Sequence, residues 1–191
     1  VAIGHSMGAR ILSRAILSKE YIKSRPNKAL PNAHVDLLVG LQGAFSAQRF
    51  VKGKGWEGSP YADFNRCTTV FSLTTSRYDT ANQTAHFITG ARHVGSKYGL
   101  AFASKNKNEF RVIKWNNNEA DSQALLSIPN SEKEKDRRVI MIDASKIVDG
   151  HNSTTKENYP SDAHNDILDE DLARLIWALI KRFAPFPCTT Q

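Results

Sequence analysis

Residues 1–10 read VAIGHSMGAR, and this stretch places a serine between two glycines directly after a short apolar run. The apolar residues 1–3 are typical of the end of a buried strand. From residue 7 onward, apolar side chains recur at roughly helical spacing, which predicts a helix within residues 7–24. Ser6 is therefore expected in a sharp turn between a strand and a helix.

Two interpretations of Ser6 fit this position. It caps the helix by accepting a hydrogen bond from a backbone N–H two or three residues on, or it is an attacking hydroxyl in a strained turn. The attacking role needs close approach of strand and helix, and Gly4 and Gly8 supply room because they lack a side chain. His5 completes the turn, and the backbone N–H of Met7 would be one oxyanion donor. The strand, turn and helix context favours the catalytic interpretation.

The rest of the chain predicts an α/β fold with a mostly parallel sheet and flanking helices. The further strands are expected within residues 34–41, 67–76 and 137–145, and a final helix is expected within residues 161–183. Strand, helix and strand in succession form a parallel crossover unit. Between about residues 80 and 137 we expect a long irregular insertion or lid, with a small hairpin at residues 109–115.

Length and composition favour one folded domain over residues 1–191. Hydrophobic residues make up 40% of the chain and charged residues 24%, as in ordinary globular proteins. The net charge is +7, but the basic residues are scattered and the densest run, residues 131–138, interleaves acids with bases. No nucleic-acid partner is therefore expected. The longest apolar runs are too short to cross a membrane.

The two cysteines do not predict a metal site. Cys67 and Cys188 form no CxxC pair, and the histidines show no zinc-ligand spacing. Whether these cysteines form a disulfide is open, as are the compartment, with the cytoplasm favoured, and the oligomeric state.

The motif GHSMG at residues 4–8, in its strand-to-helix context, resembles the serine turn of the α/β-hydrolase family. Residues 36–50 and 68–92 also resemble the segments that follow this turn in the family. The resemblance implies an esterase or lipase type of serine hydrolase that needs neither metal nor organic cofactor. In the family, the turn ends the fifth of eight strands, so residues 1–191 would be the carboxyl-terminal part of a larger hydrolase domain. A second oxyanion donor would then be missing, which lowers the rate of this piece alone by about two to three orders of magnitude.

The family order of serine, acid and histidine assigns the acid to Asp79, just past the strand within residues 67–76. Its alternative role is a turn-forming residue on a surface loop. Asp63 precedes that strand and would lie at the wrong end of the sheet, and Asp143 within the last strand is a weaker substitute.

Two histidines follow the last strand, and both satisfy the family order. His164 is favoured because it precedes the final helix, whose positive end would keep the imidazole neutral. His151 is the alternative base. The other four, which we interpret as surface, lid or structural residues, are His5, His34, His86 and His93.

The resemblance implies cleavage of a small-molecule carboxylic ester, or a related acyl bond, through an acyl-enzyme intermediate. The alternatives are acyl transfer to an acceptor other than water, a non-catalytic binding module on the same scaffold, and an adaptor for anionic partners. Four aromatic residues of the expected insertion line an apolar entrance or pack onto the body of the domain: Phe87, Tyr98, Phe102 and Trp115. The identity of the substrate is open.

Overall fold

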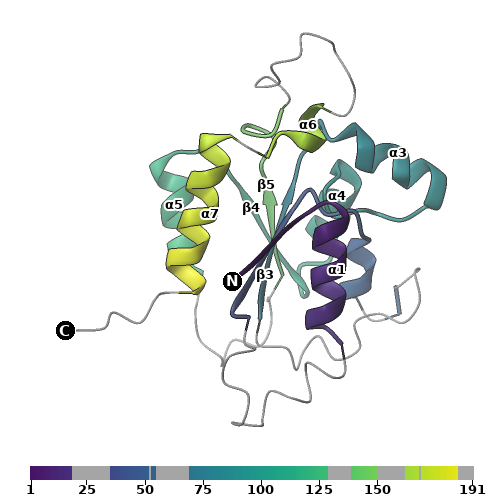
Figure 1. The fold of residues 1–191 in the computed structure, drawn as a ribbon, viewed down its shortest axis with the longest axis horizontal. Coiled ribbons are helices and arrows are strands. Elements are labelled where there is room, and N and C mark those ends of the chain that lie inside the picture. The colour runs from purple at the N-terminus through teal and green to yellow at the C-terminus, as the bar shows by residue number, and fades with distance from the viewer. Residues whose placement is uncertain are drawn as a thin grey trace.

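The computed structural model describes residues 1–18, 35–51, 53–54, 69–128, 139–149, 162–167 and 169–184. It contains a five-stranded, all-parallel sheet flanked by helices (Figure 1). This confirms the predicted α/β class with a parallel sheet and flanking helices. The strand order is β1-β2-β3-β5-β4. The strands are β1 (Ala2–His5), β2 (Leu37–Leu41), β3 (Val70–Thr75), β4 (Phe110–Lys114) and β5 (Val139–Asp143).

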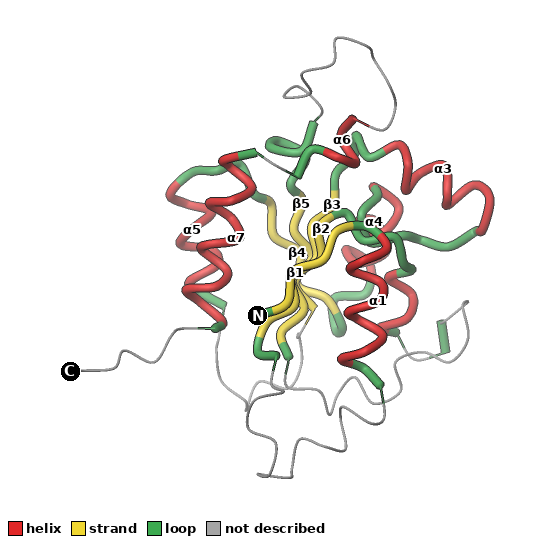
Figure 2. The backbone as a smooth tube through the Cα atoms, in the orientation of Figure 1, coloured by secondary structure: helices red, strands yellow, loops and turns green. Residues whose placement is uncertain are grey.

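Helices cover both faces of this sheet. Figure 2 shows the strands as a central layer, with α1 and α4 on one side and α5 and α7 on the other. The helices are α1 (Met7–Ile16), α3 (Thr80–Thr89), α4 (Lys97–Lys105), α5 (Glu119–Leu126), α6 (Asp162–Asn165) and α7 (Glu170–Phe183), with a 3-10 turn η1 (Ala47–Phe50). In the described part of the chain, no helix is both long and apolar enough to cross a membrane.

Two hydrophobic cores result from the alternation of side chains along the strands. The core beneath α1 and α4 receives Leu38, Phe71, Leu73, Val139 and Met141 from the sheet. The core beneath α5 and α7 receives Leu37, Val39, Leu41, Ile113, Ile140 and Ile142. Because β2 is buried on both faces, its sequence is an unbroken apolar run.

Residues 80–128 differ from the irregular insertion that the sequence predicts for residues 80–137, and residues 129–137 lie outside the described residues. The described part of this region, up to residue 128, forms α3, α4, β4 and α5. Residues 110–114 form no hairpin, because β4 pairs in parallel with β5. A parallel pair needs a crossover, and α5 lies between the two strands in sequence. The region is therefore part of the α/β framework.

The predicted final helix is two helices. Asp169 has an extended backbone, and its side chain accepts a hydrogen bond from the N–H of Asp171, which starts α7 at Glu170. The sequence prediction merged α6 with α7 and so missed this cap. The first helix ends at Ile16, and its predicted continuation falls largely outside the described residues. Outside them also lie Cys67, Cys188, Asp63, His34 and His151.

β1 forms one edge of the sheet, and it pairs with β2 alone among the described strands. Ile3 of β1, with Met7 and Ile11 of α1, keeps about half or more of its side chain exposed. The opposite side of β1 packs closely on α1. A Cβ at Gly4 would lie 2.7 Å from the backbone nitrogen of Ala9 and 2.8 Å from the carbonyl carbon of Gly8.

Gly8 does not share this constraint. Among the residues that the structure describes, a Cβ at Gly8 would meet no atom within 4 Å. The expectation that both glycines supply room is therefore correct for Gly4 and wrong for Gly8.

We predict opposite effects of alanine at these two glycines. Gly4→Ala should lower the free energy of unfolding by about 3 kcal/mol or more, since the clashing atoms are backbone and cannot rotate away. Gly8→Ala should leave it unchanged or raise it by up to about 1 kcal/mol, because alanine is the better helix former. Urea denaturation of both variants measures the difference. Equal stability of the two would contradict the close packing of β1 on α1.

Candidate active site

The candidate site lies at the carboxyl ends of the parallel strands, where α3 and α6 are also found (Figure 1). Ser6 directly follows β1, and Asp79 follows β3 by four residues. His164 lies in α6, which comes after β5 in the chain. In an all-parallel sheet the carboxyl ends of all strands lie on the same side of the sheet, so segments far apart in sequence meet there.

The backbone at Ser6 is strained and its hydroxyl does not cap the helix. Ser6 has φ 51° and ψ −117°, and its side chain makes no capping hydrogen bond to α1. A positive φ is costly for a residue with a Cβ. The turn is held by β2 and the residues after it, since the Ser6 N–H donates to the Leu41 carbonyl at 2.9 Å and the Ala44 N–H donates to the Ser6 carbonyl at 3.1 Å. The helix-cap interpretation of Ser6 is therefore wrong.

Three side chains form a continuous hydrogen-bonded row. The Ser6 Oγ lies 2.9 Å from Nε2 of His164, and Nδ1 of His164 lies 2.9 Å from Oδ2 of Asp79. The Asp79 side chain is fully buried and that of His164 is 12% exposed. Because a carboxylate only accepts, His164 donates from Nδ1, which leaves Nε2 free to accept from the serine hydroxyl.

Asp79 is the N-cap of α3, and it is not on a surface loop. Its Oδ1 accepts from the backbone N–H of Asn82 at 2.9 Å, and its Oδ2 also accepts from Asn82 Nδ2 at 2.7 Å. The weaker candidate, Asp143, is engaged elsewhere: its Oδ1 accepts from the Ser145 hydroxyl, and its Oδ2 lies 4.0 Å from Arg77.

His164 lies within α6 and is separated from α7 by residues 166–169. The expectation that it directly precedes the final helix is thus wrong, and the argument from that helix's positive end no longer applies. His5 holds the segment instead. Its Nε2 donates to the His164 carbonyl at 2.8 Å, and the two ring centroids are 4.8 Å apart. Burial lowers the pKa of His5, which favours the neutral ring that makes this bond.

Sequence reasoning missed two residues next to the acid: Asn82, which contacts it, and His93, which contacts Asn82. Asn82 binds the Asp79 carboxylate, and His93 donates from Nδ1 to Asn82 Oδ1 at 3.0 Å. Asp79 is of a residue type favoured at helix N-caps, so it could have revealed the start of α3. The sequence carries no comparable signal for His93.

Met7 is the first residue of α1, so its N–H is among the helix's amino-terminal groups that lack an intrahelical acceptor. This is the position that the sequence analysis assigns to an oxyanion donor. The positive end of the α1 dipole adds to its attraction for negative charge.

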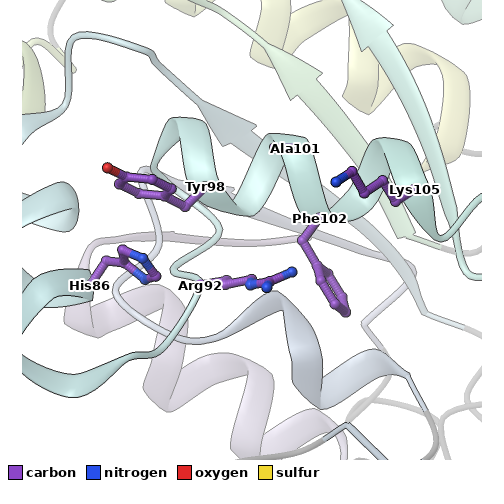
Figure 3. A pocket seen from close by; sticks show the side chains of 6 residues that line it. All are labelled: His86, Arg92, Tyr98, Ala101, Phe102 and Lys105. Atoms are coloured by element: carbon purple, nitrogen blue, oxygen red, sulfur yellow. The ribbon is translucent and has the colours of Figure 1, made fainter.

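A separate pocket of about 230 Å³ lies between the end of α3, the following loop and α4 (Figure 3). It is lined by His86, Arg92, Tyr98, Ala101, Phe102 and Lys105, and by no member of the Ser6 row. Of the four aromatic residues expected either to line an entrance or to pack onto the body of the domain, Tyr98 and Phe102 line this pocket. Trp115 is buried beneath the opposite face, and Phe87 is exposed. The four do not gather at Ser6.

Among the described residues, no three His, Cys, Asp or Glu side chains are grouped so that they could hold a metal ion. Comparison of the chain with protein-family models, curated proteins and solved structures gave no significant match. The fold and the site together define an α/β protein with a hydrogen-bonded Ser-His-Asp row at the carboxyl ends of the strands of a parallel sheet.

We predict that the protein loses stability as the pH falls below about 6.5. Burial lowers the pKa of both His5 and His93 in the folded state. The unfolded chain therefore takes up protons first, and the free energy of unfolding declines from about pH 6.5 down to the lowered pKa values. Urea denaturation between about pH 7.5 and 5.5 measures this decline.

The His93→Asn variant should show a smaller decline, because it removes one of the two histidines whose pKa is lowered in the folded state. The exposed Thr84→Ala on α3 is the control and should keep the wild-type pH dependence. A decline that is as steep in His93→Asn as in the wild type would contradict the contribution of His93.

Proposed function

We propose that this protein is a serine hydrolase of the α/β-hydrolase family that cleaves carboxylic esters through an acyl-enzyme intermediate. The observation that carries the proposal is the pair of 2.9 Å hydrogen bonds joining Ser6 Oγ to His164 and His164 to Asp79. The order of these residues in the chain and their position at the strand ends agree with the resemblance described above.

In the proposed reaction, His164 Nε2 takes the proton of the Ser6 hydroxyl as Oγ attacks the carbonyl carbon of the ester. The resulting imidazolium is stabilised by the Asp79 carboxylate, and it then gives the proton to the departing alcohol as the tetrahedral intermediate collapses to the acyl-enzyme. Water attacks next, with His164 taking its proton, and the carboxylic acid leaves with Ser6 restored.

The negative oxygen of the tetrahedral intermediate would be stabilised by the N–H of Met7. That donor stands at the amino end of α1, where the helix dipole favours negative charge. A preorganised donor of this kind contributes about 3 to 4 kcal/mol to the transition state in serine hydrolases.

The strain at Ser6 favours catalysis over a binding module on the same scaffold. A residue with a Cβ at φ 51° costs about 1–3 kcal/mol, and the Ser6 side chain makes no bond to the helix that would offset it. The strained conformation does bring Oγ to within 2.9 Å of the imidazole. A surface that only binds would not need this conformation.

We predict that Ser6→Ala abolishes covalent labelling by a fluorophosphonate probe and lowers the hydrolysis of p-nitrophenyl acetate by about 10⁴-fold or more. Mass spectrometry of the peptide that contains residue 6 identifies the labelled side chain. Thr84→Ala, on the exposed side of α3, is the control and should label at the wild-type rate.

The two aspartates provide a second, matched comparison. Asp79→Asn should lower the rate of labelling by about 10⁴-fold, because an amide favours the wrong tautomer of His164. Asp143→Asn should change it less than threefold, as its side chain binds Ser145 and not His164. Labelling of some other residue, or equal effects of the two substitutions, would overturn the proposed assignment.

A further inference from the structure

The row of hydrogen bonds does not end at Asp79. Asn82 Nδ2 donates to Asp79 Oδ2 at 2.7 Å, and His93 Nδ1 lies 3.0 Å from Asn82 Oδ1. Asp79 is fully buried, Asn82 is 2% exposed and His93 is 6% exposed. The chemistry proposed above uses neither Asn82 nor His93, although buried polar side chains of this kind are costly unless they are paired.

Two acceptor groups next to Asn82 determine which atom donates and which accepts in each of these hydrogen bonds. The amide of Asn82 faces two groups that only accept, the Asp79 carboxylate and the Gln42 carbonyl, the latter at 2.9 Å. Its Nδ2 must therefore lie on that side and its Oδ1 on the side of His93. A carbonyl oxygen needs a donor, so His93 carries its proton on Nδ1.

Asn82 has little freedom to turn away from this arrangement. A Cβ at Gly95 would lie 2.4 Å from Asn82 Nδ2, which means that the loop after α3 presses its backbone against the amide. The backbone N–H of Asn82 is also tied to Asp79 Oδ1 at 2.9 Å. Both carboxylate oxygens of Asp79 are thus held from one residue.

We propose that Asn82 and His93 are positioning residues, which fix the Asp79 carboxylate so that its Oδ2 faces His164 Nδ1. This inference rests on the proposed function, because it assigns a role at the same site. Rotating the carboxylate away from His164 would break its bonds to both the main chain and the side chain of Asn82. Rotating Asn82 would break its bond to His93 as well.

His93 can do this without opposing the charge of the row. Its pKa is lowered, first by burial and then by the positive charge of Arg10, so the ring is neutral at pH 7. A neutral donor fixes the amide of Asn82 and adds no second positive charge beside Asp79. No positive charge on His93 therefore competes with the imidazolium of His164 for the Asp79 carboxylate.

The first test reads the hydrogen-bond chain directly, with no substrate. Nitrogen-15 and proton NMR of the histidine side chains at about pH 8 distinguishes the two neutral tautomers, which differ in the nitrogen that carries the proton. We expect His93 in the Nδ1–H form, and we expect Asn82→Leu to lose it. An Nε2–H tautomer of His93 in the wild type would overturn the proposal.

The second test uses a matched pair at residue 93, with labelling of Ser6 by the fluorophosphonate as the readout. His93→Asn keeps an amide donor close to the position of Nδ1. His93→Leu is its matched control, because a leucine side chain has nearly the shape of asparagine but no donor. His93→Leu should lower the maximal rate of labelling by about ten- to a hundredfold and leave the half-saturating probe concentration unchanged, since a small misplacement of the base is costly. His93→Asn should recover the rate to within about threefold of the wild type.

Circular dichroism and urea denaturation establish that each variant is folded, and Asn82→Leu repeats the test from the other end of the bond. A folded His93→Leu that labels at the wild-type rate would overturn the positioning role. A wild-type protein that does not label at Ser6, with His93 in the Nδ1–H form, would contradict the proposed function and support the hydrogen-bond chain. The two failures are therefore distinguishable.

Discussion

The reversal of the chain at Ser6 is the constraint on which the site depends. Within one residue the backbone leaves β1 and enters α1, and Ser6 takes a positive φ of 51° to do so. Hydrogen bonds to Leu41 and from Ala44 hold this conformation, and the bare Gly4 lets α1 lie against β1. If the turn relaxed to ordinary helical angles, Oγ would rotate toward the first turn of α1 and away from His164. The strained conformation of Ser6 is thus what places its hydroxyl next to His164.

The acid, Asp79, has both a structural role and a role in the site. Asp79 caps α3 through Oδ1 and binds His164 through Oδ2, so one buried carboxylate both starts a helix and orients an imidazole. A buried carboxylate needs donors on both oxygens. Within the described ranges, Asn82 supplies two of the three N–H groups that bind the Asp79 carboxylate, and His164 supplies the third. Consequently, a substitution that loosens α3 also disturbs the site. Fold and chemistry cannot be separated at this edge of the sheet.

The sequence reveals most where the signal is local. The strand, turn and helix around Ser6 follow from apolar periodicity and two glycines, and β2 and β3 follow from short apolar and β-branched runs. It misleads over residues 80–128, because α3, α4 and α5 are short and only weakly amphipathic. The partner of β4 is β5, which lies beyond α5 in the chain, and no pattern within residues 109–115 can distinguish a parallel edge strand from a hairpin. The cap at Asp169, which separates α6 from α7, was visible in the sequence but was outweighed by helical periodicity.

By itself, the sequence determined the α/β class and the sharp turn that carries Ser6, because sterics and periodicity act over a few residues. The order in which an acid and a histidine follow Ser6 came from the resemblance to a family. Only the tertiary structure decided which side chains meet. His164 lies 158 positions from Ser6, and His93 reaches Asp79 only through Asn82. The physical reason is that a hydrogen bond depends on distances of about 3 Å, whereas these residues are brought together by the common edge of the parallel strands and not by their spacing in the chain.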